Sequence, residues 1–175
     1  MNLLVPPLIA AAALSAYVAA LSKDRAEGDD RRVAADSLVR HHEAAIFQAV
    51  ALFPTELDPS VTVPVAPFID VLDWNSALAT DTQDRLWVLT YLNQGVGSAP
   101  TTISEPGVAG ITYELQRLGF RSGTYGLWKA GTLASTIGPI SFAAGQVPSI
   151  PDGAVMVATL CQETQPDVLD CGSDV

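Results

Sequence analysis

The sequence predicts an α+β protein in which a long N-terminal helix, transmembrane and then amphipathic, packs on a small antiparallel β-sheet domain. Three observations predict this class. The first 22 of the 175 residues carry no charged side chain, residues 23–53 are charged in nearly every turn, and the remainder has short apolar segments separated by glycine and proline. We therefore expect a hydrophobic transmembrane helix at 1–22, an amphipathic helix at 23–53 and an α+β globular domain at 54–175.

Residues 3–22 form an uncharged run that is long enough to cross a bilayer. A helix of this length spans about 30 Å, which is the thickness of the hydrocarbon layer. A cleaved signal peptide is a second interpretation, because "LSAYVAALS" resembles a cleavage site, but no basic residue precedes the run. A buried helix of a soluble domain is a third. We expect the protein to contact the membrane through residues 3–22.

The apolar run is rich in alanine, and small residues let another helix approach closely. Helix-packing contacts are therefore expected at Ala10, Ala13, Ala16 and Ala20. A plain anchor built of small residues is equally compatible with this composition.

The amphipathic helix carries an apolar stripe at near-helical spacing, formed by Val39, Ile46, Val50 and Phe53. His42 falls on the same stripe and is expected to be a partly buried residue rather than a ligand. Because an apolar stripe must be covered, the sheet is its natural partner.

The sequence of the globular domain predicts short helices and strands. "DRLWVLTYLNQG" is expected to be a central strand because both of its faces are apolar. "GVAGITYELQRLG" predicts a short helix or a turn-bounded segment, with Ile111, Leu115 and Leu118 on one side. "GTYGLWKAGTLAST" and "GPISFA" predict paired strands, and "AVMVATLC" the last strand. The large aromatic residues are expected in the core: Trp74, Trp87, Trp128 and Tyr125.

The net charge of −10 is uneven along the chain. Residues 23–53 hold five basic and six acidic residues, and residues 54–175 hold four basic and thirteen acidic residues. A domain this acidic repels phosphate backbones, so the sequence argues against nucleic-acid binding.

Cys161 and Cys171 are the only cysteines. They are either two reduced thiols or, in an oxidising compartment, a disulfide. The intervening "QETQPDVLD" has little reason to form a helix or a strand, and a covalent link would order it. We favour the disulfide if the domain is exported. Two cysteines and the adjacent His41 and His42 lack the spacing of zinc ligands, so no metal site is expected.

The sequence contains no grouping typical of catalysis. A nucleophile elbow, a phosphate-binding loop and a paired-histidine metal motif are all missing from it. Asp81 and Asp84 in "ATDTQD" are typical turn and capping residues. We expect a non-enzymatic protein with no catalytic residue and no cofactor.

A hydrophobic N-terminal segment, an amphipathic helix, a strand-rich domain and a C-terminal cysteine pair together resemble type IV pilins. The tail, "GLWKAGTLAST" followed by "VPSIPDGAVMVA", resembles more closely the PilM family of conjugative thin-pilus (type IV pilus) proteins. Val5 stands where pilins usually have a glutamate, which disfavours a major pilin. The resemblance implies an inner-membrane component of pilus assembly or of the basal body, without enzymatic activity.

The expected function is therefore a membrane-anchored structural component of thin-pilus biogenesis, whose partners are other pilus-assembly proteins or pilin subunits. The alternatives are a minor pilin or pseudopilin within the filament, and a secreted soluble binding module or enzyme with a cleaved leader. We expect the inner membrane of a Gram-negative bacterium, with the domain in the periplasm or on a cell-surface pilus. The basic residues after residue 22 favour the cytoplasmic side instead, whereas a disulfide requires the periplasm.

Overall fold

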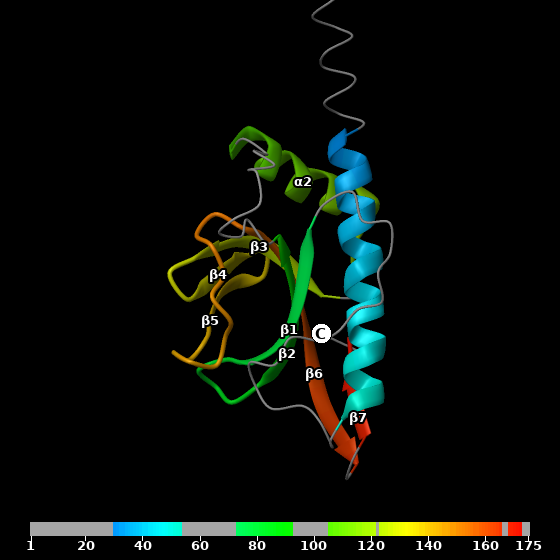
Figure 1. The fold of residues 1–175 in the computed structure, drawn as a ribbon, viewed down its shortest axis with the longest axis vertical. Helices are drawn as coiled ribbons and strands as arrows, with labels where there is room; N and C mark the ends of the chain where they lie inside the picture. Colours follow the sequence, from blue (N-terminus) through cyan, green and yellow to red (C-terminus); the bar gives the residue numbers. More distant parts are fainter. Residues whose placement is uncertain (1–29, 54–72, 93–104, 122, 166–167, 173–175) are drawn as a thin grey trace, which may run out of the picture.

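An antiparallel sheet of seven strands has helices on one of its faces in the computed structural model (Figure 1). The structure describes residues 30–53, 73–92, 105–121, 123–165 and 168–172. The α+β class with an antiparallel sheet is confirmed. The expected membrane helix at 1–22, residues 23–29, and the packing positions Ala10, Ala13, Ala16 and Ala20 lie outside the described residues.

The sheet has the strand order β1-β2-β6-β3-β4-β5. The last strand, β7, pairs with the end of β6 that extends past the segment paired with β3. Every neighbouring pair is antiparallel. The strands are β1 (Trp74–Thr80), β2 (Leu86–Leu92), β3 (Thr124–Lys129), β4 (Thr132–Ser135), β5 (Gly138–Ser141), β6 (Val155–Gln165) and β7 (Val168–Cys171). The predicted central strand is β2, which lies between β1 and β6 and is buried on both faces.

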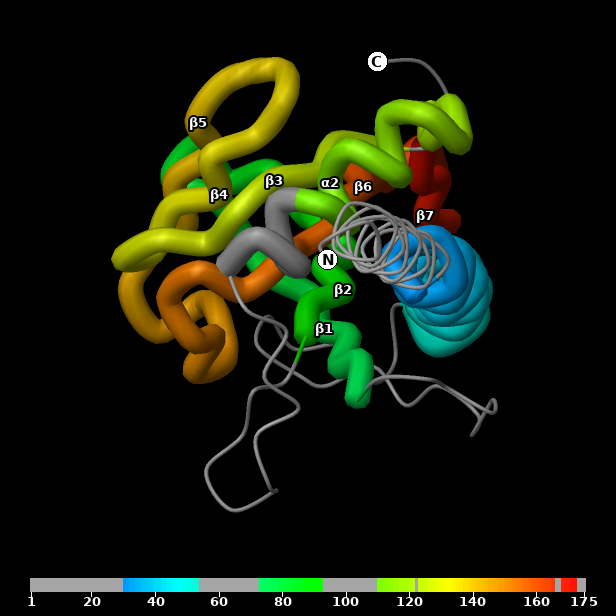
Figure 2. Tube along the Cα trace, turned by 90° about the horizontal axis from the view of Figure 1, so that it is seen from above, coloured from blue at the N-terminus to red at the C-terminus, as the bar shows by residue number. Residues whose placement is uncertain are grey.

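The sheet curls until its two ends meet at the β1–β2 turn. Asp81 forms an isolated antiparallel bridge with Phe142, and the Thr82 backbone N–H donates to the Ser141 carbonyl at 3.0 Å. Seen from above, β4 and β5 lie on the side away from the helix at 30–52 (Figure 2). The curl encloses an apolar core whose largest members are Trp87, Leu89, Tyr91, Trp128, Leu133, Phe142 and Met156.

The opposite face of the sheet is covered by a helix at residues 30–52 and by α2 (Glu105–Leu118). The two helices meet where a Cβ on Gly110 of α2 would collide with the Arg31 side chain. α2 ends because Gly119 adopts a positive φ of 69°, which lets Gly119 N–H and Phe120 N–H bond back to carbonyls of the last turn. Ile111 and Leu115 are buried, whereas Leu118, on the same side but in the last turn of α2, is 43% exposed.

The large aromatic residues are core residues, as predicted, because Trp74, Trp87, Trp128 and Tyr125 are at most 8% exposed. The segment between the cysteines differs from expectation. β6 runs on past Cys161 to Gln165, and Val168–Cys171 returns as β7, so β6 is not the last strand. The pairing of β7 with β6, rather than the local sequence, supplies the reason for extended structure here.

Candidate functional site

The inner face of the helix at 30–52 consists mainly of small residues. Ala35, Ala45 and Ala49 have no exposed surface, and neither do Leu38 and His42. Their spacing of three or four residues places them on one side of a helix. Because alanine has only a methyl group, the helix axis can lie close to the strands, and the two longer side chains fill the gap between the layers.

His42 is the polar centre of this contact. Its Nδ1 lies 2.8 Å from Oγ1 of Thr90 on β2, and its Nε2 lies 2.8 Å from Oγ1 of Thr159 on β6. Thr90 Oγ1 is also 2.8 Å from Oγ of Ser76 on β1. The network therefore ties the helix to three neighbouring strands, and it fixes the position of the helix more narrowly than apolar contacts alone would.

Burial, together with a smaller contribution from the nearby His41, lowers the pKa of His42 to about 3. The imidazole is therefore neutral at physiological pH, with one ring nitrogen donating and the other accepting. Both hydroxyl partners can adapt to either tautomer. With no exposed surface, His42 cannot reach a substrate, so the network is a structural contact and not a general acid–base site.

The outer face of the same helix has the larger apolar side chains. Phe47 is 71% exposed, Val33 is 49% exposed and Val50 is 40% exposed. Phe47 and Val50 are three residues apart, so they are neighbours on the helix surface. We call Phe47 and Val50 the outer apolar face; Val33 lies on the same side 14 residues before Phe47, with the exposed Asp36–Arg40 ion pair between them.

The predicted stripe lies between these two faces. Val39 is half-buried against the cluster that contains Leu38, and Ile46 and Phe53 are half-buried against the cluster that contains Ala45. Val50 belongs to the outer apolar face. The stripe predicted from hydropathy is therefore displaced by about one residue from the side chains that are buried against the sheet. The reason is that a hydropathy pattern gives alanine and histidine too little weight.

Cys161 and Cys171 face each other in the β6–β7 register and are joined by a disulfide with a Cα–Cα distance of 4.1 Å. Next to the bond, Leu169 of β7 is buried against Leu78 and Val88, on the face that the helix covers. The disulfide thus holds the short last strand on the sheet, beside the C-terminal half of the helix.

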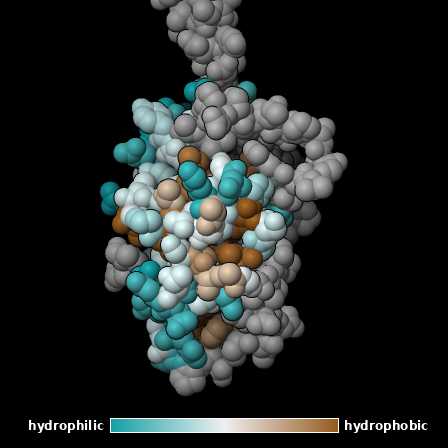
Figure 3. All heavy atoms as spheres, turned by 90° about the vertical axis from the view of Figure 1, so that its left-hand side faces the viewer, coloured by the Kyte–Doolittle hydropathy of each residue, from teal (hydrophilic) through white to brown (hydrophobic). Residues whose placement is uncertain are grey.

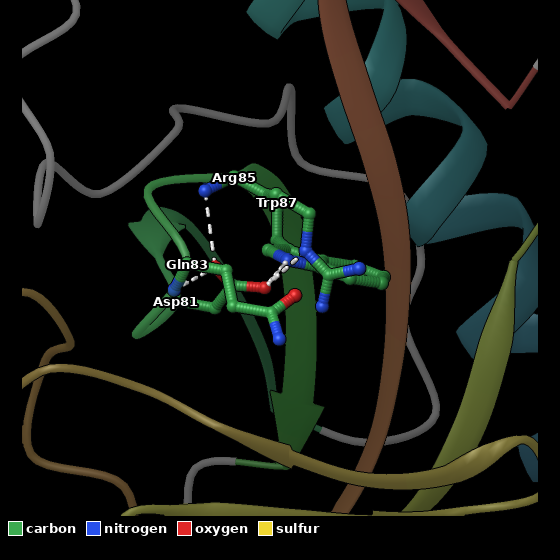
Figure 4. Close-up of polar contacts among 4 residues, drawn as sticks. All are labelled: Asp81, Gln83, Arg85 and Trp87. Carbon is green, nitrogen blue, oxygen red and sulfur yellow. Dashed lines mark hydrogen bonds and ion pairs between the residues drawn. The ribbon is translucent and has the colours of Figure 1, made fainter.

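Asp81 holds the point where the sheet closes (Figure 4). Its Oδ1 accepts from the backbone N–H groups of Gln83 and Arg85 at 2.8 and 3.0 Å, and its Oδ2 accepts from Arg85 Nε and Trp87 Nε1 at 2.7 and 2.9 Å. Burial alone would raise the pKa of Asp81, but these hydrogen bonds outweigh it and hold the pKa below its usual value. Both carboxylate oxygens of Asp81 therefore accept hydrogen bonds within the turn, and this is the turn role that the sequence "ATDTQD" predicted.

Within the described ranges, no group of three histidine, cysteine or acidic side chains is placed to hold a metal ion. No helix among the described residues is long and apolar enough to span a bilayer, and the apolar run at 3–22 is not among them. No family model, curated protein or solved structure matches the chain.

Proposed function

We propose that this chain is a non-enzymatic, membrane-anchored structural component of a type IV (thin) pilus machine, acting through helix packing and protein contacts. The outer apolar face is the observation that carries the proposal. Phe47 is 71% exposed next to the exposed Val50, on a helix whose other side is fixed to the sheet, and an aromatic side chain in this position is a suitable contact for another protein.

The position of that face in the sequence supports the same function. The helix at 30–52 follows the uncharged run at 3–22, separated only by a short polar segment. An anchor in the inner membrane would therefore keep the domain, and with it the outer apolar face, at the membrane surface within reach of neighbouring assembly proteins. The disulfide favours the periplasmic side, because such bonds persist in that compartment.

A minor pilin or pseudopilin is the second candidate. A helix packed on an antiparallel sheet, with a disulfide near the C-terminus, favours it. In that case the outer apolar face would contact the helices of neighbouring subunits within the filament instead of an assembly protein. Both candidates need the apolar run to remain attached to the domain.

N-terminal sequencing of the native protein, combined with membrane fractionation, tests the proposal. We expect an intact Met1 and a protein that leaves the membrane pellet only when detergent is added. A methylated new N-terminus would replace the proposal with the pilin. A start near Lys23 and a protein in the aqueous fraction would overturn both.

A matched pair of variants shows whether residues 3–22 are the anchor. Ala13→Asp places a charge near the centre of the run, at an insertion cost of roughly 3 kcal/mol, and should release the protein into the aqueous fraction. Ser22→Asp places the same charge at the end of the run, where it is tolerated, and should leave the protein in the pellet. Equal behaviour of the two variants would contradict a transmembrane anchor.

A further inference from the structure

A groove of about 400 Å³ lies between α2 and the β3–β4 hairpin. It is separate from the outer apolar face, since none of its lining residues belongs to the helix at 30–52. From above, α2 lies beside β3 and β4 (Figure 2). The groove is lined by Thr112, Tyr113 and Gln116 from α2, by Tyr125 and Leu127 from β3, and by Ser135 from β4. A groove of this size is within the usual range for small-molecule sites.

The described part of the lining is rich in hydroxyl and amide groups. Among the described residues that line the groove none is charged, although the whole chain has a net charge of −10. Tyr113 is 64% exposed, so the face of its ring is open to a ligand at the groove. Gln116 adds an amide that both donates and accepts, and Leu127 adds an apolar contact.

Tyr125 is the fixed part of the groove. The residue is only 8% exposed, and its ring packs edge-on against Phe120 with centroids 6.3 Å apart. Because Tyr125 also lines the groove, a ligand there would meet a ring that this packing holds in place.

The strands beneath the groove have no free backbone for a peptide. β3 is paired with β4 on one side and with β6 on the other, and β4 is paired with β3 and β5. A bound peptide therefore cannot add a strand here and would meet only side chains. The neighbouring surface with β4 and β5 has small apolar areas among polar ones rather than one broad apolar patch (Figure 3), which also disfavours an amphipathic helix.

From this chemistry we propose that the groove binds a neutral saccharide. Sugar hydroxyls pair with hydroxyl and amide side chains, and the apolar face of a sugar ring packs on an exposed tyrosine. An anionic sugar is disfavoured by the charge of the molecule. The groove is shallow and open, so the expected dissociation constant is about millimolar, equivalent to about −4 kcal/mol. The proposal does not depend on the pilus assignment.

Two-dimensional NMR of the ¹⁵N-labelled full chain tests the proposal. The protein is held in micelles of a zwitterionic detergent without a sugar headgroup, and maltose, cellobiose or chitobiose is added at millimolar concentration. We expect at least one of them to shift the amide signals of Thr112, Tyr113, Gln116 and Ser135 in a saturable way. No saturable shift with any of the three, or shifts only elsewhere, would overturn the proposal, as would a neutral Gly-Ser peptide that shifts these amides when the sugars do not.

Variants on α2 sharpen the test. Tyr113→Ala and Gln116→Ala should each weaken binding at least fivefold, because they remove the stacking ring and the amide. Tyr113→Phe should keep most of the affinity. Leu118→Ala is the matched control, since Leu118 is exposed on the same helix but does not line the groove. Equal affinity of Tyr113→Ala and Leu118→Ala would refute the site. The wild-type shift map stands even if a variant misfolds.

Discussion

The two faces of the helix at 30–52 differ in a way that simple hydropathy does not anticipate. The inner face, against the sheet, is built of alanines, one leucine and a neutral histidine, all without exposed surface. The outer face exposes a phenylalanine and two valines. A helix of a free-standing domain would place its largest apolar side chains inside. The comparison teaches that the inner face is built for close approach to the sheet, and the outer face leaves apolar side chains exposed, which is the surface that we propose another protein contacts.

His42 provides the largest expected difference between the two faces. His42→Ala leaves a cavity and takes hydrogen-bond partners from Thr90 and Thr159, so we expect it to lower the free energy of unfolding by about 3 to 5 kcal/mol. Urea unfolding followed by tryptophan fluorescence measures the loss. A change below about 1 kcal/mol would contradict the role of this residue as the anchor of the helix.

A triple variant shows whether stability depends on the hydrogen bonds of the His42 network or only on the volume that its side chains fill. His42→Leu with Thr90→Val and Thr159→Val replaces the polar groups by apolar ones of similar shape. Replacing the imidazole together with both of its hydroxyl partners is much less costly than removing one group alone, so most of the stability lost in His42→Ala should return, less the hydrogen bond that Ser76 Oγ makes to Thr90. If the triple variant is stable but the helix shifts along the sheet, the hydrogen bonds set position rather than stability.

The same substitution, alanine to leucine, should lower the stability at the inner face of the helix but not at its exposed side. Ala45→Leu inserts three carbon atoms into the contact with Leu78 and Val88 and should cost about 1 to 3 kcal/mol. Ala51→Leu makes the same change at an exposed position six residues later and should change stability by less than about 0.5 kcal/mol. Equal costs in thermal unfolding would mean that the helix is not held on its alanine side.

Between about pH 6.5 and pH 5 the pH dependence of stability is expected to come mainly from His42 on the inner face, whereas the lowered pKa of Asp81 acts at more acidic pH. The pKa of His42 is about 3 in the folded protein against 6.5 for an ordinary histidine. Below pH 6.5 the unfolded chain binds a proton that the folded protein does not, so stability falls by roughly 1.4 kcal/mol for each unit as the pH decreases. Comparing urea midpoints at about pH 6 and pH 5 avoids most carboxylate titration. The triple variant should lose this slope.

Strands β2 to β6 were predictable because their signals are local, whereas β1 (Trp74–Thr80) was not among the expected strands. β2 has apolar residues on both of its faces, and the glycines around β3, β4 and β5 mark the turns between paired strands. The inner face of the helix was not predictable from hydropathy, because the partners of His42 are 48 and 117 residues away in sequence. The groove takes residues from separate segments, and β7 depends on pairing with β6. Each of these features is created by tertiary contacts.

The smallest expected effect on folding is at the outer apolar face. Phe47→Ser should change the free energy of unfolding by less than about 0.5 kcal/mol, since the ring is mostly in solvent. In cells, the same variant should lose co-purification with its partner protein. Ile137→Ser is the matched control, because Ile137 is 64% exposed on the β4–β5 turn. A large loss of stability in Phe47→Ser would show that this chain covers its own outer face.

Site-specific photo-crosslinking in intact cells tests the central claim most directly. A photoreactive phenylalanine analogue is placed at position 47 or at position 137 of the full chain, and adducts are identified after irradiation. Position 47 should crosslink to one defined partner, a pilus-assembly protein or a pilin, whereas position 137 should give little adduct. Equal crosslinking at the two positions, or none at position 47 in a correctly folded protein, would contradict a helix whose outer face contacts another protein.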